Sequence, residues 1–125
     1  MFNIDISATP DRGVVLTLAA LRAAERLGLS ARVLAEVIGV SEPSVSRMKK
    51  GGYVLEDGSK SFELAAVFVR LFRALDAISG GDEAVARAWM AAPNLALGGP
   101  PVMRIATIAG LLDVTAYLDA RRAPV

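Results

Sequence analysis

The chain has 125 residues, including 14 Lys and Arg and 13 Asp and Glu, a formal net charge of +1, and no cysteine or histidine. Their absence excludes disulfides, thiolate nucleophiles, imidazole bases and thiolate or imidazole metal ligands, so any metal site would need oxygen ligands. A hydrophobic fraction of 54% with 6% aromatic residues indicates a compact helical chain of one or two small domains. The near-neutral charge by itself argues against a nucleic-acid partner.

The first residues carry no basic cluster before an apolar stretch, so we expect no targeting segment. The longest run without a charged residue, 88–103, is interrupted by several prolines and glycines. It does not provide the roughly 20 continuous apolar residues of a membrane span. Together with the absence of cysteine, these features lead us to expect a cytoplasmic protein.

Three helices are predicted in the first half of the chain, where proline and glycine separate segments of helical periodicity. The first runs from about Pro10 to Leu27, with Thr9 as its N-cap. A second follows Ser30 and ends before Gly39, and a third covers about 42–50. The residues expected on the buried face of the first helix are Val14, Val15, Leu18, Leu21 and Leu27.

The second half is also predicted to be helical. The segment 53–59 is expected to be a loop, and a long amphipathic helix is expected over 61–78. Another helix begins at Asp82 and continues through Trp89, and an irregular segment covers 93–101. Two short helices are expected over 102–108 and 111–121. Because no segment alternates with a period of two, the predicted fold class is all-α.

Residues 31–50 have the spacing of a helix-turn-helix motif. Ala35 is small where the two helices would cross, and Gly39 supplies the positive backbone angle of the turn. In such a motif the second helix enters the major groove of DNA, and the first helix meets the phosphate backbone. The apolar residues expected to hold the two helices together are Leu34, Ile38, Val40, Val45 and Met48.

The second helix of this pair carries the polar side chains expected at DNA. Its outward positions are predicted to be Glu42, Ser44, Ser46, Arg47, Lys49 and Lys50. We assign Ser44 and Arg47 to base edges, because arginine pairs with the two acceptors of guanine, and Lys49 and Lys50 mainly to phosphate. Ser30 at the start of the preceding helix is assigned to phosphate. The complete predicted DNA-binding set is Ser30, Ser41, Ser44, Ser46, Arg47, Lys49 and Lys50.

The placement of charge carries this assignment. Residues 1–62 hold eight basic and seven acidic side chains and residues 63–125 hold six of each, so neither half is basic. Three of the eight cations in the first half lie within 47–50. The alternative is an ordinary helical hairpin with a solvated basic face.

Several short stretches resemble known regulators. Those of the first half are Leu27-Gly-Leu-Ser, Leu34-Ala-Glu-Val-Ile-Gly-Val-Ser and Val45-Ser-Arg, which resemble the Xre and Cro/C1 class of helix-turn-helix proteins. Those of the second half include Leu71-Phe-Arg-Ala-Leu-Asp, Ala88-Trp, Pro93-Asn, Leu97-Gly-Gly-Pro-Pro and Tyr117-Leu-Asp-Ala-Arg-Arg, which resemble the toxin-binding domain of the Xre/MbcA/ParS antitoxins. The resemblance implies an antitoxin that binds a RES-domain, NAD-consuming toxin and represses its own operon.

The resemblance also makes two segments of the second half candidates for toxin binding. The residues of the loop, where Asn94 can cap a turn before two glycines and two prolines, are Asn94, Leu97, Gly98 and Gly99. The residues of the C-terminal tail, whose arginines and terminal carboxylate would reach the toxin's nucleotide pocket, are Tyr117, Asp119, Arg121, Arg122 and Val125. The alternatives are that Trp89, Leu95 and Leu97 fill the core, and that the tail is a frayed helix end.

These observations predict a helix-turn-helix domain over 1–60 and a toxin-binding domain over 61–125. We expect no enzyme and no cofactor, because the carboxylates are scattered and the prolines after Gly99 remove N–H groups that a phosphate would need. The expected partners are operator DNA, a RES-domain toxin and a second copy of the chain, with the exposed part of the 61–78 helix as the preferred dimer interface. The competing function is a helix-turn-helix regulator that acts without a toxin.

Overall fold

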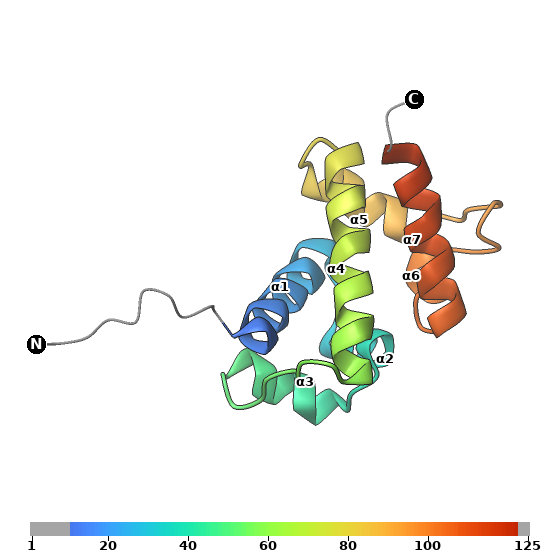
Figure 1. The fold of residues 1–125 in the computed structure, drawn as a ribbon. Helices are drawn as coiled ribbons and strands as arrows, with labels where there is room; N and C mark the ends of the chain where they lie inside the picture. The colour runs from blue at the N-terminus through green and yellow to red at the C-terminus, as the bar shows by residue number, and fades with distance from the viewer. Residues whose placement is uncertain (1–10, 123–125) are drawn as a thin grey trace, which may run out of the picture.

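The computed structural model describes residues 11–122, and these form helices joined by short turns and loops (Figure 1). The helices are α1 (Arg12–Leu27), α2 (Ala31–Ile38), α3 (Glu42–Lys49), α4 (Lys60–Ile78), α5 (Glu83–Ala91), α6 (Pro101–Arg104) and α7 (Ile108–Arg122). No strand occurs between residues 11 and 122. The predicted all-α fold, with the helix-turn-helix segment first and a helical C-terminal part after it, is therefore confirmed.

The long helix α4 organises the molecule. It packs against α1, α2 and α7, and α1 and α7 lie on opposite sides of it (Figure 1). Such a helix has apolar residues around most of its circumference, since neighbours cover more than one of its faces. Its buried residues are Phe62, Ala65, Phe68, Val69, Leu71, Ala74 and Leu75. One continuous core therefore joins the helix-turn-helix part to the C-terminal part.

Helix α1 differs from the prediction in both its start and its buried face. It begins at Arg12, and the side chain of its N-cap, Asp11, accepts hydrogen bonds from the backbone N–H groups of Gly13 and Val14. Thr9 and Pro10, which were expected to start the helix, lie outside the described residues. The residues that do face the core are Gly13, Thr17, Ala20, Ala23, Ala24 and Leu27.

The predicted buried face of α1 is therefore wrong for three of its residues. Val14, Val15 and Leu18 are exposed, Leu18 at 61%. The small residues allow α1 to approach its neighbours closely, and a Cβ on Gly13 would overlap the carbonyl oxygen of Leu55. Thr17 is satisfied inside the core, since its hydroxyl donates to the Gly13 carbonyl and accepts from the Leu55 N–H. The core face of α1 is therefore the one whose small residues permit close packing, and not the one with the largest apolar side chains.

The C-terminal end also differs from the prediction. The segment expected to hold two short helices instead contains the single turn α6 and the longer helix α7. The two meet at a close contact, because a Cβ on Gly110 would overlap the carbonyl oxygen of Arg104. Glycine at this position therefore lets α7 begin earlier than expected and pack along α4. Ile78, the last residue of α4, is 45% exposed.

Two further features concern membranes and metals. Among the described residues, no helix has both the length and the apolar character needed to cross a membrane. Within the same residues, no three or more Asp and Glu side chains come together as a group that could hold a metal ion.

Candidate functional site

The α2–α3 pair has the predicted turn geometry. Ser30 caps α2 by accepting from the Val33 N–H, and Ser41 caps α3 by accepting from the Ser44 N–H. Gly39 joins the two helices with φ 73° and ψ 36°, a left-handed conformation in which its N–H donates to the Ala35 carbonyl. The residues buried between the helices are Leu34, Ala35, Ile38, Val45 and Met48. The apolar positions assigned from the sequence therefore lock this pair, except that Val40 is only half-buried.

Arg47 is held in place by its neighbours. One of its terminal nitrogens donates to the Ser44 hydroxyl at 3.0 Å, and its guanidinium lies over the Tyr53 ring at 5.9 Å from the centroid. The Ser44 hydroxyl in turn lies 2.8 Å from that of Ser41. This chain of contacts fixes the direction of Arg47 from two sides. Tyr53 was not found by sequence reasoning, because it lies outside the motif in a segment expected to be a plain loop.

Ser44 does not point outward, in contrast to the prediction. It is only 7% exposed, because its side chain turns back toward the N-cap of α3. The Ser44 hydroxyl forms hydrogen bonds with the side chains of Arg47 and Ser41. The other predicted outward residues of this segment, Glu42, Ser46, Arg47, Lys49 and Lys50, are exposed.

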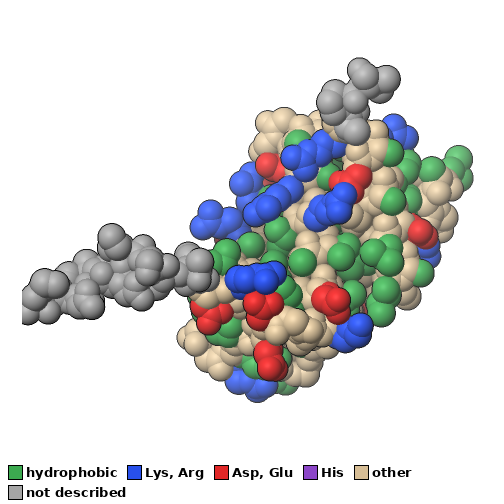
Figure 2. Space-filling view, viewed as in Figure 1, with side chains coloured by type: hydrophobic (Ala, Val, Ile, Leu, Met, Phe, Trp, Pro, Cys, Tyr) green, Lys and Arg blue, Asp and Glu red, His purple; other side chains and the backbone are tan. Residues whose placement is uncertain are grey.

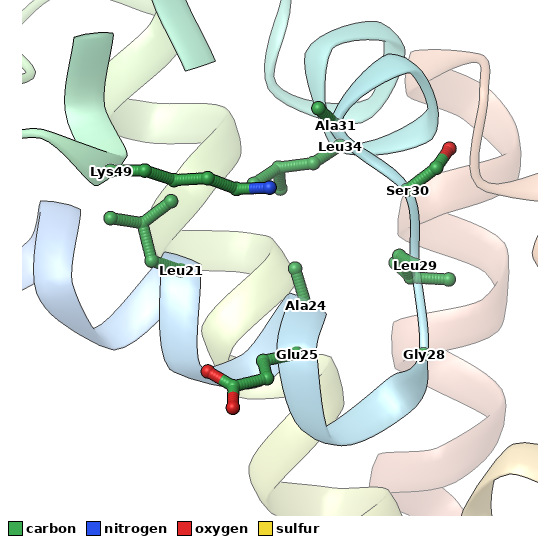
Figure 3. A pocket seen from close by; sticks show the side chains of 9 residues that line it. All are labelled: Leu21, Ala24, Glu25, Gly28, Leu29, Ser30, Ala31, Leu34 and Lys49. Carbon is green, nitrogen blue, oxygen red and sulfur yellow. The ribbon is translucent and has the colours of Figure 1, made fainter. Parts of the chain in front are cut away.

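Lys49 lies on the side of α3 that faces α1. Its side chain extends beside Leu21 along a pocket of about 600 Å³ between α1, α2 and the end of α3 (Figure 3). Glu25 and Ser30 are the other polar side chains of this pocket. The ammonium group of Lys49 therefore lies near the first turn of α2, whose N–H groups favour anions. Lys50 follows as the C-cap of α3 and is exposed.

The predicted loop of the C-terminal part is an ordered turn. The Asn94 side chain accepts from the Leu97 N–H at 3.2 Å, and the Asn94 carbonyl accepts from the Gly99 N–H at 3.1 Å. Gly98 has φ 74°, so a side chain there would strain the turn. Leu97 points inward and is 8% exposed, whereas Leu95 at the tip is fully exposed. The alternative in which Leu95 fills the core is therefore wrong.

Large apolar side chains are exposed on this loop and on the two helices that follow it. Those that are exposed on the loop, α6 and α7 are Leu95, Met103, Ile108 and Leu112. Hydrophobic side chains also gather over the start of α7 in Figure 2. A neighbouring cavity of about 680 Å³ is lined by the loop, by Arg104 and by Asp113, Ala116 and Tyr117 of α7. Three of the exposed residues, Met103, Ile108 and Leu112, were missed because the two short helices expected there gave no face to assign.

The predicted tail residues have different surroundings. Tyr117 stacks on Trp89 with ring centroids 6.1 Å apart, and the guanidinium carbon of Arg121 lies 4.2 Å from the Tyr117 ring centroid. Asp119 binds Arg70 of α4 at 2.7 Å, so its carboxylate ties α7 to α4. Arg122 is exposed at the end of α7. Val125 lies outside the described residues.

Arg87 connects the C-terminal part to the end of α1. Arg87 of α5 donates to the Arg26 carbonyl at 3.0 Å and to the Glu25 carbonyl at 2.9 Å, both at the end of α1. It also pairs with Glu83 at 2.8 Å. The guanidinium thereby supplies donors to carbonyls in the last turn of α1, where intrahelical partners run out. The start of the C-terminal part is thus attached directly to the helix-turn-helix part.

Comparison with protein families agrees with this arrangement. The family model of the antitoxin Xre-like helix-turn-helix domain matches residues 7–70, and that of the antitoxin Xre/MbcA/ParS C-terminal toxin-binding domain matches residues 74–123. The two matches meet within α4, whereas the division expected from the sequence falls at its first turn. No curated protein matches the chain. With an antitoxin helix-turn-helix and a toxin-binding domain in succession, the chain belongs to the Xre/MbcA/ParS-type antitoxins.

Proposed function

We propose that this cytoplasmic antitoxin binds and neutralises a RES-domain, NAD-degrading toxin and represses its own operon. The observation that carries the proposal is the joining of both domains on one helix: α4 packs against α1 and α2 of the helix-turn-helix and against α7 of the toxin-binding domain. An arrangement of this kind links a DNA-binding surface rigidly to a protein-binding surface. In this proposal the protein acts by binding DNA and the toxin, and it is not an enzyme.

The proposed DNA-binding surface is the exposed side of α3 with the first turn of α2. Arg47, supported by Ser44 and Tyr53, is proposed to read a base edge. Ser46, Lys49 and Lys50 are proposed to bind phosphate together with the first turn of α2, where the hydroxyl of Ser30 is already used as a cap. Ser41 and Ser44 are proposed to contribute indirectly: Ser41 caps α3, and Ser44 holds the Arg47 side chain.

A homodimer is proposed because two helix-turn-helix motifs on adjacent half-sites bind more tightly than one. The exposed strip of α4 was expected to form its interface. In the structure that strip borders exposed apolar residues of α1, including Val15 and Leu18, and a groove of about 340 Å³. These residues support an interface that α1 and α4 share.

The proposed toxin-binding surface combines the loop and the end of α7. Leu95 with the other exposed apolar residues around the loop supplies area that a partner can bury. Arg121 and Arg122 supply charge at the end of α7, and Val125, which lies outside the described residues, is proposed to contact the toxin as well. Asn94, Leu97, Gly98 and Gly99 hold the loop in shape, and Asp119 holds α7 on α4.

Co-expression with the protein encoded by the neighbouring reading frame tests the proposal. A RES-domain toxin expressed alone should lower cellular NAD and stop growth, and this chain should restore both. Binding of the purified pair to a fragment of their own promoter tests autoregulation. If the neighbouring product is not toxic and the chain still binds its promoter, the competing function, a regulator without a toxin, replaces the proposal.

A further inference from the structure

Three side chains form a continuous stack on the surface of the C-terminal part. The ring of Trp89 on α5 lies against that of Tyr117 on α7 with an interplanar angle of 26°. The guanidinium of Arg121 also lies over the Tyr117 ring. Tyr117 and Arg121 are four residues apart, so they share a face of α7. Trp89 and Tyr117 are half-buried, and Arg121 is exposed. The stack thus begins between two helices and ends in solvent.

Arg121 is a side chain that the fold orients before any partner binds. A free arginine at a helix end loses rotamer freedom when it is captured, which weakens binding. Contact with an aromatic ring favours a cation through the ring quadrupole, and the second ring keeps the first from turning away. Within residues 11–122 no hydrogen bond or ion pair engages the guanidinium of Arg121. No residue of this described part therefore occupies its N–H groups.

Resting on the proposed function, we propose that Trp89 and Tyr117 are positioning residues that hold Arg121 for capture by a pair of oxyanion oxygens on the toxin. A guanidinium presents its donors in a fork that matches a carboxylate or a phosphate, and such bidentate bonds are stronger than neutral ones. Arg122 carries the same charge one residue later and lies over no aromatic ring of residues 11–122, so the affinity lost in Arg122→Ala measures the contribution of charge without the stack.

The first test needs no toxin. In NMR spectra of the free protein, the Arg121 Hδ resonances should be shifted upfield by the ring current of Tyr117, while those of Arg122 should not. Tyr117→Phe keeps the ring and should keep the shift, and Tyr117→Leu should abolish it. Unshifted Arg121 resonances in the folded wild-type protein overturn the stack whether or not the chain is an antitoxin.

The second test measures toxin affinity by calorimetry with the full chain. Arg121→Ala should raise Kd by about tenfold or more, as expected for a lost charged hydrogen-bond pair. Trp89→Leu should raise Kd by about two- to tenfold, the range for re-ordering one long side chain. In the Arg121→Ala background, Trp89→Leu should have no further effect. An equal effect of Trp89→Leu in both backgrounds means that Trp89 contacts the toxin directly or only supports the fold, and it overturns the positioning role.

Two sources of the oxyanion are separated by competition. If the oxygens belong to a phosphate-containing ligand bound to the toxin, saturating inorganic pyrophosphate should change wild-type affinity and leave Arg121→Ala affinity unchanged. If pyrophosphate changes neither affinity, the oxygens are those of a toxin carboxylate. A loss of affinity equal for Arg121→Ala and Arg122→Ala would show that only total charge matters and would reject the inference. Failure of the wild-type chain to bind the toxin overturns the proposed function, while the NMR result still decides the stack.

Discussion

Replacing Arg47 with alanine tests the DNA-binding surface most directly. In the free protein the Arg47 side chain makes one hydrogen bond, to the Ser44 hydroxyl at 3.0 Å, and one contact with the Tyr53 ring. Both are at an exposed site, so their loss should cost about 1 kcal/mol of folding stability, which a typical domain tolerates. Loss of a base contact should weaken operator binding by about 1–3 kcal/mol, or roughly 5- to 150-fold.

Fluorescence anisotropy with labelled promoter DNA measures this effect. If Arg47 reads a base, Arg47→Ala should bind operator variants at one position with nearly equal affinity and should keep most of the salt dependence. If Arg47 contacts only phosphate, binding should weaken on every sequence and the salt slope should fall by about one. Arg122→Ala at the end of α7 is the control, because it removes an exposed positive charge at the end of the molecule opposite α3 (Figure 1). Unchanged affinity of Arg47→Ala on the operator would refute its role in DNA binding.

Three other changes test the C-terminal part. Gly110→Ala should lower the free energy of unfolding by about 2 kcal/mol, despite the higher helix propensity of alanine, because its Cβ would overlap the Arg104 carbonyl. Chemical denaturation measures this loss. Gly52→Ala is the control and should show no such loss, because its Cβ would meet only ordinary contacts. Leu95→Ser should weaken toxin binding by about tenfold without changing the melting temperature, since Leu95 is fully exposed, and a lower melting temperature would contradict this. Deletion of 121–125 should abolish toxin neutralisation, while circular dichroism should still show a helical protein. If cells that co-express the toxin and the truncated chain survive, the tail is not needed for neutralisation.

The helix-turn-helix could be predicted closely because its constraints are local. Capping by Ser30 and Ser41 and the left-handed turn at Gly39 depend on residues only a few positions apart. The apolar positions of α2 and α3 follow the helical period, since each short helix has one face against the core. The direction of Ser44 could not be predicted, because two serines and an arginine one turn apart on α3 can each face water until their mutual hydrogen bonds are known.

The errors in α1 and α7 have a common cause. The periodicity of α1 identified its large residues as the buried face, but its core face is made of small ones, from Gly13 to Ala24. A small face contributes little hydrophobicity to a sequence pattern and is recognised only by the close backbone contact it permits, as at Leu55. Gly110 fell between the two short helices expected over 102–108 and 111–121, because its contact with Arg104 was not visible in the sequence.

The sequence by itself determined the all-α fold, the DNA-binding motif and the family, since these depend on local spacing and on short residue stretches. Only the tertiary structure decided which faces of the helices are buried and which are exposed to a partner. It showed that α4 serves both halves, that Leu95 lies outside and Leu97 inside, and that Trp89, Tyr117 and Arg121 stack across two helices. These properties depend on contacts between residues distant in the chain, and helical periodicity gives no distance between one helix and another.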